Sequence, residues 1–182
     1  MLYNKQRGRL GRVDDWYDCD TWRTWTRCDL ELSLKIGIFK GARSFLAILY
    51  EETMRIHSHK ELIVFKCAFD LALQIHQLTK LFPAEDKYSL TDQIRRSSRS
   101  VAANIAEAFV KRRYPNYFVS KLIDCEGEAA ETQVWLNFAN AFGYLDETDM
   151  QVLDEKYDHI QAQIFTMIQS PQKWSIQPPD SS

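Results

Sequence analysis

Residues 89–113 read SLTDQIRRSSRSVAANIAEAFVKRR, and this stretch decides the fold. At 100° per residue, one arc of a helix collects its apolar and small side chains: Leu90, Ile94, Ser98, Val101, Ile105 and Phe109. The opposite side collects four arginines: Arg95, Arg96, Arg99 and Arg113. The pattern predicts an amphipathic helix with one core face and one cationic face.

A strip of small residues separates these two faces. It contains Ala102, Ala103 and Ala106, whose short side chains let a neighbouring helix or subunit come close. We therefore predict that the three alanines form an oligomer interface. Asn104 and Glu107 lie beside the strip, and we expect both to have hydrogen-bond partners, because buried polar groups are nearly always paired.

Periodic apolar positions before this stretch predict another helix, from about Lys60 to Lys80. Its predicted core face consists of Phe65, Phe69, Ala72, Ile75 and Leu78. Pro83 ends this helix, because proline has no N–H to donate and restricts the residue before it. The second helix, residues 89–113, then begins with Ser89 as its predicted N-cap.

Two more helices are predicted after residue 113. The third runs from Pro115 to about Gly143, with this core row: Phe118, Leu122, Cys125, Ala129, Thr132, Leu136 and Ala139. The fourth follows Asp146 as N-cap and ends before Pro171, with this core row: Met150, Leu153, Tyr157, Ile160, Ile164 and Met167. Because the connections are short, we predict an all-α fold, an antiparallel up-down-up-down four-helix bundle over residues 58–170.

The two ends of the chain differ from this region. Residues 1–57 hold three of the five tryptophans without sustained periodicity and predict an irregular extension, while the polar, proline-rich residues 171–182 predict a disordered tail. One interpretation of residues 17–28, YDCDTWRTWTRC, is an arm that stacks on bases. The other interpretation is that translation starts at Met54, since Glu51 and Glu52 allow codons that resemble a ribosome-binding site.

The charge of the chain is unevenly distributed. Its net charge of −2 gives no overall signature of a nucleic-acid-binding protein. Residues 89–113 nevertheless carry six Lys or Arg against two acids, and residues 146–158 carry six acids against one Lys. We therefore expect a bundle with a basic side and an acidic side. No apolar run reaches the 18 residues that predict a membrane span.

Residues with reactive or metal-binding side chains do not form a recognisable catalytic pattern. The four cysteines (19, 28, 67 and 125) form no CxxC pair, which favours buried thiols in a reducing cytoplasm. Glu107, Glu128 and Glu131 suggest a carboxylate metal centre, but the chain has no Glu-x-x-His motif. The serines of the second helix have no neighbouring histidine. We predict no catalytic residues, no metal and no cofactor.

Three segments within residues 62–167 resemble a known family: KCAFDLALQIHQLTKLFP, YSLTDQIRRSSRSVAANIAEAF and YFVSKLIDCEGEAAETQVWLNFANAFGYL. The family is that of the small four-helix bundle proteins encoded in intervening sequences of bacterial 23S ribosomal RNA genes. The most specific positions are Gln93, Ile94, Arg95, Ser100, Asn104, Ile105, Ala106, Glu107, Glu131, Thr132, Gly143, Tyr144 and Leu145. The chain departs from the usual pattern at Ala108, where glycine is common, and at Glu128, where a small residue is common.

The resemblance implies a fold and a set of partners. Most proteins of this family have no established activity. Their relatives, the accessory variability proteins of diversity-generating retroelements, assemble as pentameric barrels and use a basic surface to bind nucleic acid and a reverse transcriptase. The resemblance therefore implies a homo-oligomer, a pentamer first and a dimer second, with RNA or DNA and a reverse transcriptase as further partners.

The basic residues of the second helix are the predicted nucleic-acid-binding site: Arg95, Arg96, Arg99, Lys111, Arg112 and Arg113. An ordinary solvated helix face is the competing interpretation. We expect Asn104, Glu107 and Glu131 to be structural polar residues, with arginines or helix ends as donors to the two acids. The competing interpretation of Arg95 is that it turns inward and pairs with Glu107 or Glu131 instead of binding phosphate.

Our prediction is a cytoplasmic, non-enzymatic, self-assembling bundle that binds nucleic acid non-specifically through its second helix. The alternative is a protein–protein interaction scaffold with no nucleic-acid role.

Overall fold

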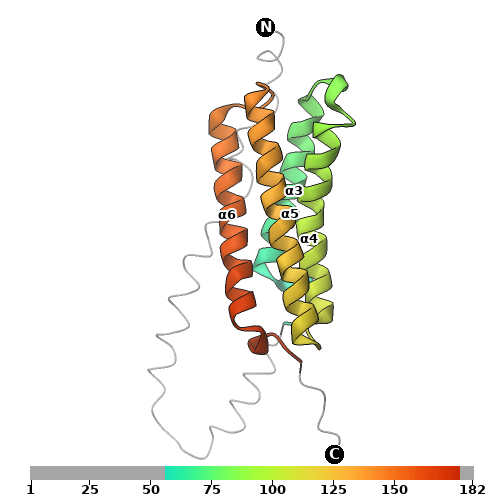
Figure 1. The fold of residues 1–182 in the computed structure, drawn as a ribbon, viewed down its shortest axis with the longest axis vertical. Helices are drawn as coiled ribbons and strands as arrows, with labels where there is room; N and C mark the ends of the chain where they lie inside the picture. Colours follow the sequence, from blue (N-terminus) through green and yellow to red (C-terminus); the bar gives the residue numbers. More distant parts are fainter. Residues whose placement is uncertain (1–55, 177–182) are drawn as a thin grey trace, which may run out of the picture. The chain divides into compact units, whose positions relative to one another are not determined.

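The computed structural model describes residues 56–176, and within this range the chain forms four α-helices. These are α3 (Ile63–Leu78), α4 (Leu90–Lys111), α5 (Pro115–Ala141) and α6 (Glu147–Gln169). The helices lie side by side and alternate in direction (Figure 1), because each connection is too short for anything but an immediate reversal. The predicted all-α bundle is confirmed.

Short 3-10 turns occupy the ends of the helices and their connections. They are η5 (His59–Glu61), η6 (Thr79–Leu81), η7 (Ala84–Asp86) and η8 (Pro171–Lys173). The predicted helix over residues 60–80 is therefore a 16-residue α-helix with a 3-10 turn on either side. The segment predicted as a disordered tail begins with η8, which packs against α5.

Each helix packs mainly against its neighbour in the sequence. The α4–α5 interface is the most extensive, the α3–α4 and α5–α6 interfaces are smaller, and a limited contact between α3 and α6 closes the bundle. In consequence α4 and α6 lie at opposite corners of the bundle (Figure 1).

The core rows predicted for α4 and α5 are confirmed. Ile94, Val101 and Ile105 of α4 are fully buried, and all seven predicted core residues of α5 are buried, from Phe118 to Ala139. In α6 the row from Leu153 to Met167 is buried, and only Met150 is partly exposed. These helices each bury a row at three- and four-residue spacing, as an amphipathic helix does.

The predicted core face of α3 is wrong in part. Ala72 and Ile75 are buried as expected, but Phe69 is 49% exposed, and Phe65 and Leu78 are only partly buried. The buried row is Val64, Cys67, Ala68, Leu71, Ala72 and Ile75. This row is rich in small side chains, which let α3 approach its neighbours closely, so the bulky phenylalanines lie at the edge of the interface.

The helix ends show which capping predictions hold. Asp146 accepts a hydrogen bond from the Asp149 amide at 2.8 Å, as predicted for an N-cap. Ser89 stands at the N-cap position of α4, but its hydroxyl donates to the Asp86 carboxylate at 2.9 Å and caps no amide, which corrects the prediction. Gly143 follows α5 with φ of 75°, the left-handed conformation that ends many helices.

The predictions for residues 1–55, which include the aromatic arm and a start at Met54, lie outside the described residues. Residues 177–182 of the predicted tail lie outside them as well. None of the four helices described above is long and apolar enough to cross a membrane.

Candidate nucleic-acid interface

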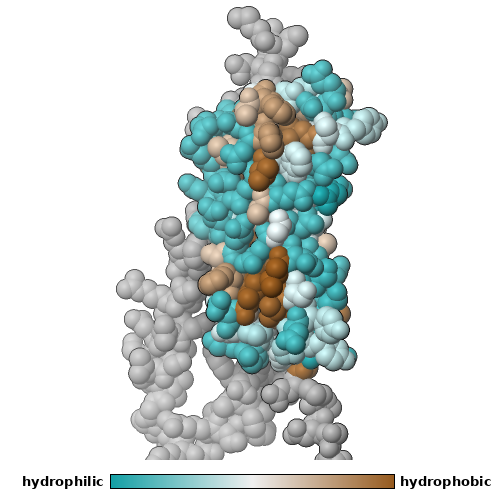
Figure 2. Space-filling model, viewed as in Figure 1, coloured by the Kyte–Doolittle hydropathy of each residue, from teal (hydrophilic) through white to brown (hydrophobic). Residues whose placement is uncertain are grey.

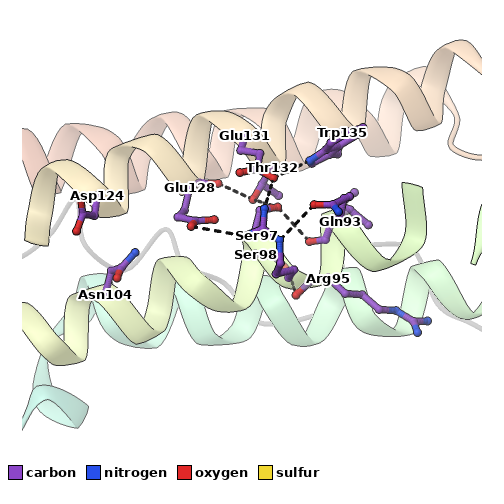
Figure 3. Close-up of polar contacts among 12 residues, drawn as sticks. Gln93, Arg95, Ser97, Ser98, Asn104, Asp124, Glu128, Glu131, Thr132 and Trp135 are labelled. Carbon is purple, nitrogen blue, oxygen red and sulfur yellow. Dashed lines mark hydrogen bonds and ion pairs between the residues drawn. The ribbon is translucent and has the colours of Figure 1, made fainter. Parts of the chain in front are cut away.

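The six basic residues predicted as a single site have different surroundings. Arg96 faces α5, where its guanidinium lies 2.6 Å from the Glu131 carboxylate and 3.9 Å from that of Glu128. The same Glu131 oxygen accepts a hydrogen bond from the Trp135 indole at 3.1 Å (Figure 3). The charge of Arg96 is therefore balanced by acids of the neighbouring helix. Glu131 has the arginine partner that we predicted for it, but the donor is Arg96 and not Arg95.

Lys111 is also balanced by acidic groups. Its ammonium lies 3.3 Å from the Glu107 carboxylate, which is 3.2 Å from the ammonium of Lys121 on α5. Lys121 further contacts Asp124 at 3.2 Å and donates to the Asn104 side chain at 3.3 Å. Asn104 and Glu107 thus have partners, but these are lysines rather than arginines or backbone groups.

Glu107 is a surface residue in this structure. Its side chain is 52% exposed, so Glu107 is paired as expected but is not buried. Hydrogen bonds from Lys121 and then Lys111 lower the pKa of its carboxyl. Because water screens such exposed pairs, they contribute little to stability.

Arg112 and Arg113 lie at the far end of α4. The Arg112 guanidinium stacks on the Phe109 ring, 3.5 Å from its centroid, and donates to the Phe109 carbonyl at 2.7 Å. Burial lowers the pKa of Arg112, and the neighbouring Arg113 lowers it further. Arg113 is exposed. It lies 18 residues beyond Arg95, which is about 27 Å along a helix.

Arg95 and Arg99 face α3 instead of α5. Arg95 donates from Nε to the Thr79 hydroxyl at 2.7 Å, and its side chain points away from α5 (Figure 3). Arg99 donates from Nε to the Arg95 carbonyl at 2.6 Å. Thr79 in turn donates to the Ile75 carbonyl at 2.7 Å. The last turn of α3 therefore holds Arg95 in place.

Two further basic residues, His76 of α3 and Lys80 of η6, join this pair, and sequence reasoning missed both. Burial lowers the pKa of His76, and the charges of Arg95, Lys80 and Arg99 lower it further, which places the four side chains in one region. We call His76, Lys80, Arg95 and Arg99 the α3–α4 cationic group. Within residues 56–176, none of the four forms an ion pair with an acid. In an antiparallel bundle the end of one helix lies beside the start of the next. The predicted order of the helices therefore already indicated that His76 and Lys80 lie near Arg95 and Arg99.

The polar residues between α4 and α5 hold the helices together. Thr132 donates to the Ser97 hydroxyl at 2.9 Å and to the Glu128 carbonyl at 2.8 Å (Figure 3). The Cys125 thiol contacts the Val101 carbonyl at 3.3 Å. Burial raises the pKa of Cys125 to about 12, so this thiol stays protonated at neutral pH. Neither Ser97 nor Cys125 therefore has the activation that a nucleophile needs.

The alanines predicted as an oligomer interface differ in exposure. Ala102 is buried at 6% exposure among the chain's own helices, Ala106 is partly buried, and Ala103 is exposed. Across residues 56–176, no group of three His, Cys, Asp or Glu side chains is arranged to hold a metal ion.

Comparisons with known proteins give a family and several similar solved structures. The model of the 23S rRNA-intervening sequence protein family matches residues 60–166. The chain is also similar to the crystal structure of a protein of unknown function from the S23 ribosomal protein family of Bacteroides thetaiotaomicron VPI-5482. The two share 27% identity with a TM-score of 0.54, over 59% of this chain and 96% of that one. No curated protein matches the chain.

Proposed function

Because the chain belongs to the 23S rRNA-intervening sequence protein family, we propose that it is a non-enzymatic, self-assembling bundle that binds the phosphate backbone of nucleic acid. The observation that carries the binding proposal is the α3–α4 cationic group. It brings together basic side chains from two helices, and no acid within residues 56–176 forms an ion pair with them.

The electrostatics of this group favour an anionic ligand. Burial is the largest cause of the lowered pKa of His76, and the positive charges of Arg95, Lys80 and Arg99 lower it further, so all three lie close enough to act on His76. An anion placed there would be attracted by the charges of Lys80, Arg95 and Arg99. Arginine suits phosphate in particular, because its planar guanidinium donates two parallel hydrogen bonds to phosphate oxygens.

The group supports binding without base recognition. Its charged members are the cations Lys80, Arg95 and Arg99, and cations that contact phosphates position a protein on nucleic acid without reading the sequence. Of the six residues predicted from the sequence, Arg95 and Arg99 belong to the group, whereas the charges of Arg96 and Lys111 are balanced by acids. We therefore centre the proposed interface on the α3–α4 side of the bundle.

Fluorescence anisotropy with labelled RNA and DNA of unrelated sequences tests the proposal. The wild-type protein is titrated at roughly 50 and 200 mM salt, since binding to phosphates makes affinity fall steeply with salt. Arg95→Gln together with Arg99→Gln should weaken binding to all sequences by similar factors. The salt slope should become shallower by about one unit for each phosphate that the variant no longer neutralises.

Lys111→Gln is the matched control, because it removes one basic charge from the same helix at a position that already has an acidic partner. It should change the affinity for nucleic acid much less than Arg95→Gln or Arg99→Gln does when each is made singly. Equal losses for Lys111 and for the arginines would refute the assignment to the α3–α4 cationic group. An absence of binding by the wild-type protein at about 50 mM salt would refute the nucleic-acid function.

A protein–protein interaction scaffold is the second candidate function. It is favoured by exposed apolar side chains on the outer face of α5, among them Ile123, Val134 and Phe138. Self-association, as a pentamer or a dimer, is part of both functions. Light scattering of the purified protein at micromolar concentration tests it, and a monomer would refute it.

A further inference from the structure

The α3–α4 cationic group consists of two pairs of residues, and the members of each pair are four positions apart. His76 and Lys80 stand at the end of α3 and in η6. Arg95 and Arg99 stand on α4. The Thr79 hydroxyl joins the two pairs, since it donates to the His76 carbonyl at 3.2 Å and accepts from Arg95 Nε at 2.7 Å. The end of α3 and the start of α4 therefore hold the two pairs side by side, at one end of the bundle (Figure 1).

The surface around α4 suits a polar ligand. Figure 2 shows apolar surface gathered over α5, with hydrophilic surface on the α4 side of it. Lys80 and Arg99 are exposed, and Arg95 is partly buried. An anion from solvent can therefore reach the group without crossing apolar surface.

The two arginines are each held in place through one nitrogen. Arg95 Nε donates to the Thr79 hydroxyl, and Arg99 Nε donates to the Arg95 carbonyl at 2.6 Å. Among residues 56–176, the Nη1 and Nη2 atoms of both arginines have no hydrogen-bond partner. Guanidinium nitrogens donate parallel hydrogen bonds to the oxygens of a phosphate. Both arginines thus combine a fixed position with donors that are free for a phosphate group.

The imidazole of His76 is exposed beside these donors. In the described part of the chain, neither of its ring nitrogens has a hydrogen-bond partner. A neutral imidazole carries one N–H, whereas an imidazolium carries two and a positive charge. Neighbouring cations favour the neutral form, and a neighbouring anion favours the charged form. An anion bound between His76 and the arginines would therefore change the protonation of the imidazole.

The charged groups near His76 are basic. Arg95 and Arg99 come from α4, and Lys80 comes from η6. Lys156 of α6 contacts a different side chain of α3, and η5 packs at the other end of that helix. Burial and then the three nearest cations lower the pKa of His76, and no acid among residues 56–176 acts on it in the opposite direction. Without a ligand, the site thus favours the neutral imidazole.

We propose that one phosphate group of the bound nucleic acid lies among Arg95, Arg99 and His76, and that His76 takes up a proton when this phosphate binds. The proton comes from solvent and returns to it when the phosphate leaves, and no covalent bond forms or breaks. This inference rests on the phosphate binding in the proposed function and adds its regulation by pH. The affinity for nucleic acid should rise as pH falls through the range in which His76 titrates.

Fluorescence anisotropy of the full chain with labelled oligothymidylate tests this dependence. Neither thymine nor a phosphodiester titrates near neutral pH, so the probe keeps its charge. Affinity is measured at roughly pH 5.5 and 7.5, since histidine is the side chain that ordinarily titrates in this range. A rise of one unit in the pKa of His76 on binding corresponds to a tenfold gain in affinity. We expect the wild-type protein to bind about three- to tenfold more tightly at the lower pH.

Two substitutions of His76 separate its charge from its shape. His76→Gln has no titrating group and should lose most of the pH dependence. His76→Lys carries a positive charge at both pH values, so it should bind at pH 7.5 about as tightly as at pH 5.5. His159→Gln is the matched control, because it removes a histidine from α6 and should keep the wild-type pH dependence. Circular dichroism at both pH values checks that each variant remains helical.

Nuclear magnetic resonance of the imidazole protons measures the proton uptake directly. The chain has four histidines, so three of them serve as internal controls. Oligothymidylate should raise the pKa of His76 and leave the pKa values of the other three unchanged. Arg95→Gln together with Arg99→Gln should abolish this rise, because the phosphate would no longer be held beside the imidazole.

The other outcomes overturn defined parts of the proposal. An absence of binding by the wild-type protein at both pH values would refute the proposed function and this inference together. Binding with the same affinity at both pH values, or a pH dependence that survives in His76→Gln, would refute only the role of His76. A rise in the pKa of a different histidine would refute the position assigned to the phosphate.

Discussion

At the scale of single residues, the interface between α4 and α5 contains one carboxylate in an unfavourable position. Glu128 has a side chain that is 24% exposed, and among residues 56–176 the one cation that forms an ion pair with it is Arg96, at 3.9 Å. Within the described residues, its second carboxylate oxygen has no hydrogen-bond partner. Burial raises the pKa of the Glu128 carboxyl, whereas Arg96 acts in the opposite direction. The charged form of the Glu128 carboxyl therefore lowers the stability of the folded protein.

This cost predicts that Glu128→Gln stabilises the protein at neutral pH. A carboxyl whose pKa is raised by folding destabilises the folded state above that pKa, and the effect disappears as pH falls through it. At pH 7 the variant should gain about 1 kcal/mol in unfolding free energy. The gain should vanish below about pH 4, where the carboxyl is protonated in both states. Urea denaturation at both pH values measures it.

Asp124→Asn is the control for this measurement. Asp124 is 53% exposed and its partner is Lys121, so its neutralisation should change stability by less than about 0.5 kcal/mol. Destabilisation by Glu128→Gln at pH 7 would show that the contact with Arg96 outweighs the burial of the charge.

At the scale of helices, the end of α5 depends on one backbone conformation. Gly143 has φ of 75°, and its amide donates to the Asn140 carbonyl at 2.8 Å. The next amide, that of Tyr144, reaches back to the Ala139 carbonyl at 2.9 Å. These hydrogen bonds pair carbonyl groups that would otherwise have no partner at the end of the helix.

We expect Gly143→Ala to destabilise the protein by about 1 kcal/mol, because an alanine is strained at positive φ. Gly127→Ala should instead stabilise the protein, by roughly 0.5–1 kcal/mol, because alanine favours the helix and the added methyl group meets no other atom of the chain. Urea denaturation of both variants tests the pair. A neutral Gly143→Ala would mean that the chain relaxes around the substitution.

How well the sequence predicts the buried face of a helix depends on how many apolar rows that helix contains. On α4 one row is apolar and the opposite side is cationic, so the core face is unambiguous. On α3 apolar residues occupy almost every position from Ile63 to Leu73, and several faces fit the helical period. The neighbouring helices select the row with Ala68 and Leu71, and their positions cannot be deduced from α3 alone.

At the scale of the whole molecule, the candidate site could be predicted only in part. The sequence contains the basic residues, but it does not show which of them acquire acidic partners. Arg96 meets Glu131 from a helix 35 positions away, and this pairing exists only after the bundle has formed. His76 and Lys80 were missed for the same reason, since they join Arg95 and Arg99 through packing between α3 and α4.

The packing order of the helices predicts a gradient of local stability. Because α4 and α5 share the most extensive interface and each contacts a second helix, their central amides should exchange hydrogen roughly tenfold more slowly than those of α3 and α6. Native-state hydrogen exchange followed by mass spectrometry measures this difference. Equal protection in all four helices would show instead that the bundle opens only as a unit.

The opposite corners taken by α4 and α6 have an electrostatic consequence. The six acids of residues 146–158 belong to α6 and its N-cap, while Arg95 and Arg99 of the cationic group belong to α4, at the opposite corner. Within residues 56–176 the acidic and the cationic side chains are thus separated, which gives this part of the chain an electric dipole moment. An approaching polyanion exerts a torque on this dipole before any contact forms, and it turns the cationic side inward and α6 outward. If nucleic acid binds as proposed, the α6 side of the bound protein is negative and repels further polyanion strands.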